Sequence, residues 1–106
     1  MAWICLVVAG VLEVAWAYSM KKSDGFTLLV PSAITIVLMI ASFALLSVSM
    51  KTLPLGTAYS VWTGIGAAGA FIVGIAFLGE AATPMRILAA GLILMGIVLM
   101  KLASSP

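Results

Sequence analysis

The chain has 106 residues, of which 65% are hydrophobic and 8% charged, whereas roughly 25% of the residues in an ordinary soluble domain are charged. This composition excludes a soluble globular protein and leaves the lipid bilayer as the solvent. The net charge is only +2, and the sequence has no His and one Cys. We therefore expect no nucleic-acid partner, no metal centre, no cofactor and no enzymatic reaction.

Four runs are long and apolar enough to cross a membrane, because about 20 helical residues span a hydrocarbon core of about 30 Å. They cover residues 2–20, 26–50, 55–78 and 85–101. Short breaks that carry charge, glycine or proline separate these runs, and such short connections predict antiparallel neighbours. The expected fold is an all-α membrane protein, with residues 1–106 forming a single four-helix transmembrane domain.

The first run contains Glu13, a carboxylate near the middle of a predicted span. Helical rise places it about 16 Å from the start of the run. A charged side chain there costs about 3 kcal/mol, so we expect a function, namely exchange of a proton for a cation. The alternative is a protonated carboxyl that bonds a neighbouring helix. Gly10 and Trp16 lie one turn away on either side and share its helix face.

Polar and aromatic residues in the next two runs complete a candidate binding site around Glu13. Ser42 is a hydroxyl well inside the second run, and Tyr59 and Trp62 lie one turn apart in the third. Aromatic faces attract cations by about 0.5 to 2 kcal/mol, and hydroxyls can orient a carboxylate. The alternatives are an interfacial aromatic belt for Trp16, Tyr59 and Trp62, and a bond from Ser42 to its own helix.

The third run also contains Gly64, Gly66 and Gly69, which match the G-x-G-x-x-G dinucleotide pattern. No strand precedes them and they lie inside a membrane-length run, so we reject nucleotide binding. Small residues let helices approach closely. Gly64 and Gly66 are therefore expected to serve packing, the pocket or a bend.

The fourth run has Ala89 and Gly96 seven residues apart on one face, flanked by bulky apolar residues. This face is a candidate dimer seam. Lys101 ends the run, where it can anchor the helix at the interface or contribute to the pocket.

The charges in the breaks are almost balanced across the membrane. Alternating spans place Lys51 and Lys101 on one side and Lys21, Lys22 and Arg86 on the other. A bias of one charge permits insertion in both orientations, so that two copies could pair antiparallel; a single orientation is the alternative. Because four helices can hardly enclose a solvated site and also gate it, we expect a dimer. Asp24 and Glu80 are interpreted, like the lysines and the arginine in the breaks, as loop and topology residues.

Two segments carry a resemblance to a known family, the small multidrug resistance transporters, over essentially the whole chain. They are GVLEVAWA at residues 10–17 and LPLGTAYSVWTGIG at residues 53–66. Gly10 and Trp16, together with Lys101, resemble the guanidinium-exporter subtype more than the quaternary-ammonium subtype. The resemblance implies an antiparallel, dual-topology homodimer in the bacterial inner membrane. One position departs from the family, because Ala89 stands where a glycine is often found.

The resemblance also implies how the site works: Glu13 of both subunits binds substrate and protons in alternation, and Trp16, Ser42, Tyr59 and Trp62 shape the pocket. The expected function is proton-coupled antiport of guanidinium or related small cations by alternating access. Guanidinium suits this site because it is planar, forms two parallel hydrogen bonds to a carboxylate and stacks on indole. Three alternatives remain, which are export of quaternary ammonium compounds, a small dual-topology ion channel and a purely structural membrane subunit.

Overall fold

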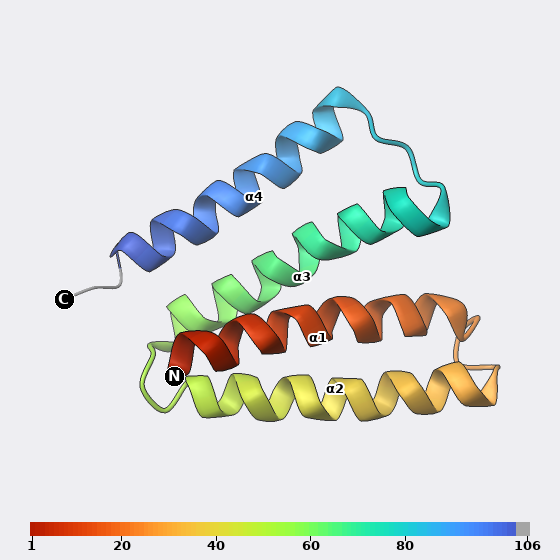
Figure 1. Ribbon diagram of the computed structural model, residues 1–106, viewed down its shortest axis with the longest axis horizontal. Helices are drawn as coiled ribbons and strands as arrows, with labels where there is room; N and C mark the ends of the chain where they lie inside the picture. Colours follow the sequence, from red (N-terminus) through yellow and green to blue (C-terminus); the bar gives the residue numbers. More distant parts are fainter. Residues whose placement is uncertain (104–106) are drawn as a thin grey trace.

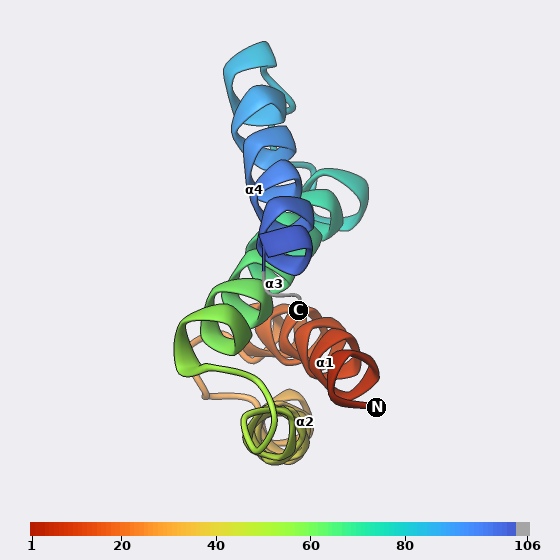
Figure 2. The ribbon, with the colours of Figure 1, turned by 90° about the vertical axis from the view of Figure 1, so that its left-hand side faces the viewer.

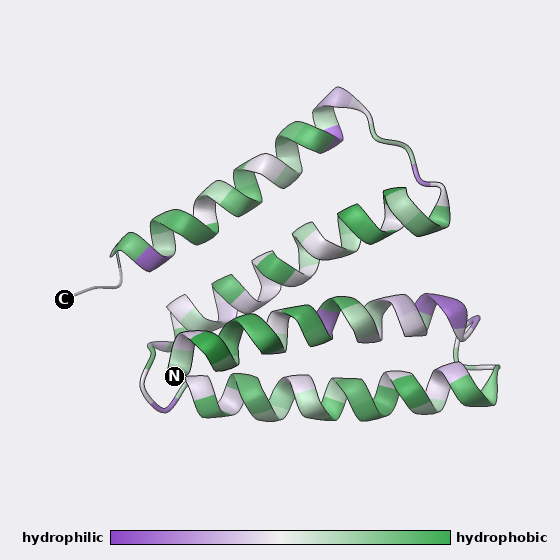
Figure 3. Cartoon of the chain, viewed as in Figure 1, coloured by the Kyte–Doolittle hydropathy of each residue, from purple (hydrophilic) through white to green (hydrophobic). Residues whose placement is uncertain are grey.

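The computed structural model describes residues 1–103. They form four helices, α1 (Ala2–Lys22), α2 (Leu29–Ser49), α3 (Leu55–Leu78) and α4 (Pro84–Ala103). All four are long and apolar enough to cross a membrane, and hydrophobic residues run along each of them (Figure 3). No strand occurs among the described residues. The prediction of an all-α protein with four transmembrane helices is confirmed.

The helices follow one another in the spatial order α2, α1, α3, α4 (Figures 1 and 2). α1 packs against both α2 and α3, whereas the backbone of α4 approaches α3 alone. The molecule measures 46 × 34 × 16 Å, so it is thin in one direction. A thin arrangement leaves one face of most helices without a protein neighbour.

The turn after α1 explains why α2 begins later than the expected residue 26. The hydroxyl of Ser23 donates to the carbonyl oxygen of Met20 at 2.6 Å and accepts the backbone N–H of Phe26 at 3.0 Å. Asp24 and Phe26 have positive φ angles of 51° and 66°, which are incompatible with a right-handed helix. The second helix therefore starts at Leu29.

The connection between α3 and α4 also has defined ends. α3 ends at Leu78, and the residue that follows, Gly79, has a φ of 68°, the left-handed conformation that commonly ends helices. α4 begins at Pro84, one residue earlier than expected, and proline suits a first helical position because it needs no backbone donor. The hydroxyl of Thr83 accepts the backbone N–H of Arg86 at 3.2 Å and caps the helix.

The core lies between α1, α2 and α3. Its buried hydrophobic residues are Leu6, Ala9, Leu46, Ala58, Val61 and Trp62. Close approach of α1 to α3 depends on Gly10, because a Cβ there would lie 2.6 Å from Cγ2 of Ile65. α4 contributes no buried residue. The core therefore holds three helices together and leaves the fourth at its edge.

Candidate cation-binding site

Glu13 lies in the middle of α1 and faces α3. Its carboxylate packs directly on Gly66, where a Cβ would collide with Oε1. Oε1 is buried and has no hydrogen-bond partner within residues 1–103. Buried polar atoms in proteins are almost always hydrogen-bonded, so an acceptor left open points to a missing donor. A cation or a proton supplies such a donor.

A chain of hydrogen bonds joins all three core helices beside this carboxylate. The indole N–H of Trp62 in α3 donates to Ser42 Oγ in α2 at 3.0 Å. The Ser42 hydroxyl in turn donates to the backbone carbonyl of Ala9 in α1 at 2.7 Å. Ser42 therefore bonds a neighbouring helix and not its own. Since Ala9 lies one turn before Glu13, this chain fixes the helix that carries the carboxylate.

Four aromatic rings form a continuous row next to the network. Trp16 meets Phe43 edge to face with ring centroids 6.4 Å apart, and Phe43 meets Trp62 at 5.6 Å. Tyr59 lies 5.6 Å from Trp62 in a tilted arrangement. Phe43 was missed by sequence reasoning, because an apolar residue in an apolar run gives no signal. Its position directly after Ser42 was the only pointer.

The three predicted aromatic residues differ in their surroundings. Trp62 is buried, which is unlike a residue of an interfacial belt. Tyr59 is 53% exposed, so its ring has one free face. The indole Nε1 of Trp16 is buried without a partner within the described residues. Trp16 thus offers an open donor one turn from the open acceptor of Glu13.

The remaining candidate residues lie outside the row of aromatic rings. Gly10 packs on Ile65, and a Cβ at Gly64 would lie 3.0 Å from Cδ1 of Ile97 in α4, so both glycines serve helix packing. The Lys101 ammonium lies 4.8 Å from the ring centroid of Trp3, about 15 Å from Glu13 along α1. Within one chain, Lys101 is therefore remote from the carboxylate.

The predicted seam on α4 is uncovered in the single chain. Ala89 is exposed, and a Cβ built at Gly96 meets no atom of residues 1–103 within 4 Å. The face that holds these two residues is free to pack against another protein surface.

Four helices of membrane-crossing length, with a carboxylate between α1 and α3 and a row of aromatic rings nearby, define a small multi-pass membrane protein with a candidate site for an organic cation. Residues 1–103 match the family of the Small Multidrug Resistance protein. The chain belongs to this family, and the family membership predicted from the two segments is confirmed.

Individual relatives are similar over nearly the full length. The guanidinium exporter of Citrobacter freundii is 59% identical over 98% of this chain and 99% of its own length. The guanidinium exporter of Yersinia pseudotuberculosis is 62% identical over 98% of this chain and 100% of its own. The guanidinium exporter of Salmonella typhi is 58% identical over the same share of this chain. Family and helices together make the chain a multi-pass protein of the bacterial inner membrane.

Proposed function

We propose that this protein exports guanidinium and small guanidinyl cations, and that it binds them at Glu13. The observation that carries the proposal is the carboxylate packed on Gly66 in mid-span, whose Oε1 has no hydrogen-bond partner among residues 1–103. Relatives named guanidinium exporters support the same substrate class. The role is transport and not catalysis, and the four helices act as one transport domain.

The chemistry of the site matches that of the substrate. Guanidinium presents N–H donors in one plane, which suits a two-pronged bond to the Glu13 carboxylate. The face of Trp16 adds cation–π attraction, which strengthens when water is excluded. The bonds of Ser42 to Ala9 and Trp62 hold the surrounding helices in place. Specificity then comes from a fixed carboxylate and a fixed aromatic wall.

Exchange follows if a proton and a cation compete for Glu13. The deprotonated carboxylate takes the cation from the inside, and the transporter then switches its opening. Protons that arrive from outside neutralise the carboxylate and release the cation. Because the two ligands exclude each other, inward movement of protons drives outward movement of guanidinium.

The working unit in this proposal is an antiparallel homodimer of dual topology. α4 has no buried residue and exposes the Ala89 and Gly96 face, which supports pairing through that helix. The balanced loop charges support insertion in both orientations. Two copies supply eight helices, enough to surround two Glu13 carboxylates. Ala89 adds a methyl group to the seam, which changes the packing but still permits pairing.

Uptake of labelled guanidinium into liposomes tests the proposal. Purified protein is reconstituted, a proton gradient is imposed, and the wild type is compared with Glu13→Gln. Asp24→Asn is the matched control, because it removes an exposed carboxylate from the turn after α1. The proposal expects gradient-driven uptake in the wild type and the control and none in Glu13→Gln.

Other outcomes point to the alternatives. Transport of a quaternary ammonium compound without guanidinium flux would assign the multidrug subtype. Flux that neither saturates nor shows counterflow of labelled substrate would indicate a channel. Absence of flux for both substrate classes in correctly folded protein would favour a structural subunit.

A further inference from the structure

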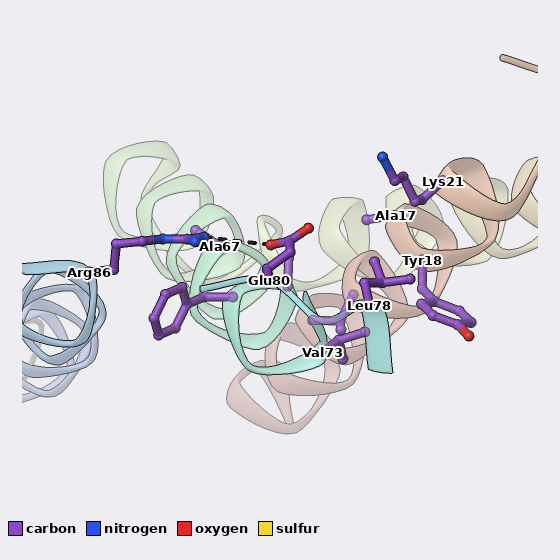
Figure 4. Close-up of a pocket in the computed structure, with 11 residues that line it drawn as sticks. Ala17, Tyr18, Lys21, Ala67, Val73, Leu78, Glu80 and Arg86 are labelled. Carbon is purple, nitrogen blue, oxygen red and sulfur yellow. Dashed lines mark ion pairs between the residues drawn. The ribbon is translucent and has the colours of Figure 1, made fainter. Parts of the chain in front are cut away.

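A second carboxylate meets a guanidinium group at the connection between α3 and α4. Nη2 of Arg86 lies 3.5 Å from Oε1 of Glu80, and Nη1 donates to the carbonyl oxygen of Ala81 at 2.7 Å. The guanidinium carbon lies 5.1 Å from the ring centroid of Phe71. Figure 4 shows the side chain of Arg86 extending toward the carboxylate of Glu80.

These contacts together have the chemistry of a guanidinium-binding site. A carboxylate and a carbonyl accept N–H donors, and an aromatic ring covers the planar cation. The bound group here is the end of an arginine side chain, which is itself a guanidinium. A free guanidinium ion has the same plane, charge and donors and fits the same partners.

Glu80 is held in place by contacts that do not involve Arg86. The backbone N–H of Glu80 donates to the carbonyl oxygen of Gly74 at 3.0 Å, across the left-handed turn at Gly79. The side chain also packs against Gly74, where a Cβ would collide with the carboxylate. Displacement of Arg86 would therefore leave the acceptor where it is.

The ion pair is partly exposed and lines a pocket. The side chains of Arg86 and Glu80 are each 42% exposed, and exposed ion pairs contribute little to stability. The pocket has a volume of about 360 Å³ and reaches from these two residues to Val14 and Ala67. Those residues directly follow Glu13 and Gly66 in the chain, so the inner end of the pocket lies at the same level of α1 and α3 as the central carboxylate.

We propose that Glu80, Phe71 and the carbonyl of Ala81 form a second guanidinium site at the membrane face, with Arg86 as its internal competitor. Arg86 occupies the site until a free guanidinium displaces it, so the site holds the cation at the pocket mouth, on the way to or from Glu13. This inference rests on the proposed function, because it assumes guanidinium as the transported ion. Its ligand class is guanidinium and singly substituted guanidinyl cations.

The test is an amide chemical-shift titration of the full-length protein in bicelles with guanidinium chloride at constant ionic strength. Glu13→Gln is the background, so that binding at the central site does not contribute. The amides of Gly74 and Gly79 report on the second site. We expect saturable shifts whose apparent dissociation constant falls about threefold to fivefold when Arg86→Gln is added, since an exposed ion pair is a weak competitor. Adding Glu80→Gln should abolish the saturation.

Matched controls distinguish removal of the Arg86 side chain from the Glu80 site from a general change in charge. Lys22→Gln removes one positive charge at the same end of the molecule, from a residue that touches the pocket only through the ring of Tyr18; it should change the constant less than twofold. Tetramethylammonium chloride carries the same charge without N–H donors and should give no saturable shift. Arg86→Lys keeps the charge and, because it lacks the planar fork, should tighten binding about twofold.

Several results would overturn the proposal. Saturable shifts that persist in Glu80→Gln would show that guanidinium binds elsewhere. An equal fall of the dissociation constant in Lys22→Gln and Arg86→Gln would show that the effect comes from net charge alone. If the folded Arg86→Gln protein binds guanidinium no more tightly than the background protein, Arg86 does not compete for the site. If Arg86→Gln does not fold, an unchanged dissociation constant in Arg86→Lys would contradict competition in the same way. Guanidinium uptake by the wild type is measured separately. If the titration finds no second site, the proposed export of guanidinium is unaffected. If uptake is absent, guanidinium is not the transported ion and the second site loses its basis.

Discussion

The three core helices and α4 differ in how they are held. α1, α2 and α3 share all the buried hydrophobic residues of the core and the hydrogen bonds through Ser42. α4 lies along α3 with no buried residue of its own. Figure 1 shows this difference as a compact group of three helices beside a fourth that diverges from α3 toward the connecting loop.

The difference follows from what each part must satisfy in a membrane. Polar groups inside the bilayer require partners, because lipid offers no hydrogen bonds. The helices around Glu13 are therefore fixed by hydrogen bonds and by side chains that fit against glycines. An apolar helix such as α4 pays no such penalty, since lipid tails are as apolar as leucine. The site thus lies among the three helices that share the core, and α4 keeps an uncovered face.

Removal of the central carboxylate should have the largest effect on the site. In Glu13→Gln, we expect guanidinium affinity to fall by about hundredfold or more, because loss of one partner of a buried ion pair costs about 3 kcal/mol or more. Isothermal titration with guanidinium measures this loss. Glu13→Asp is the companion variant and should retain saturable binding, whereas undiminished affinity in Glu13→Gln would place the site elsewhere.

A methyl group at Gly66 should displace the carboxylate without removing it. In Gly66→Ala the new Cβ collides with Glu13, and such overpacking costs about 1 to 3 kcal/mol. We expect guanidinium affinity to fall by about tenfold or more. Gly56→Ala is the control in the same helix, because a Cβ there meets nothing within 4 Å. Equal affinities in the two variants would contradict the role given to Gly66.

Loss of the Ser42 hydroxyl should have a smaller effect, because the carboxylate itself stays. Ser42→Ala leaves the indole N–H of Trp62 and the carbonyl of Ala9 without their shared partner, at a cost of about 1 to 3 kcal/mol. We expect a lower thermal midpoint, a shifted tryptophan emission spectrum and guanidinium affinity reduced about fivefold. Ser47→Ala, at an exposed position of α2, should leave all three unchanged. An unaltered emission spectrum in Ser42→Ala would exclude the bond to Trp62.

Changes on α4 should have the smallest effect on the site. We expect Ala89→Gly to leave guanidinium affinity within about twofold of the wild type, because Ala89 is exposed in the single chain and exposed positions change stability little. Dimer content, measured by cross-linking in liposomes, should shift while binding does not. A large loss of affinity would show that α4 shapes the site and would remove the contrast between the two regions.

The sequence predicts the helices well because hydrophobic runs of membrane length have few other uses. It places the start of α2 at residue 26, whereas the left-handed residues Asp24 and Phe26 delay the helix to Leu29. No propensity rule anticipates a positive φ at a phenylalanine. Helix ends therefore depend on turn geometry that appears only in three dimensions.

The central site is predictable in part. Glu13 stands out by its depth, and Ser42 and Trp62 stand out by their residue types. Their hydrogen bonds to each other and to Ala9 depend on how the helices rotate against one another, which sequence spacing does not give. Glu80 and Arg86 were interpreted as topology residues, because their meeting requires the left-handed turn at Gly79.

Exchange requires a proton and a guanidinium ion to compete for the same carboxylate. The most direct test is the guanidinium dissociation constant of the wild-type protein measured over a range of pH. Competition predicts weaker binding as pH falls, approaching a tenfold rise of the constant per pH unit once Glu13 is protonated, since one proton must leave for each cation bound. A dissociation constant that stays the same across the pH range in folded protein would contradict exchange at Glu13.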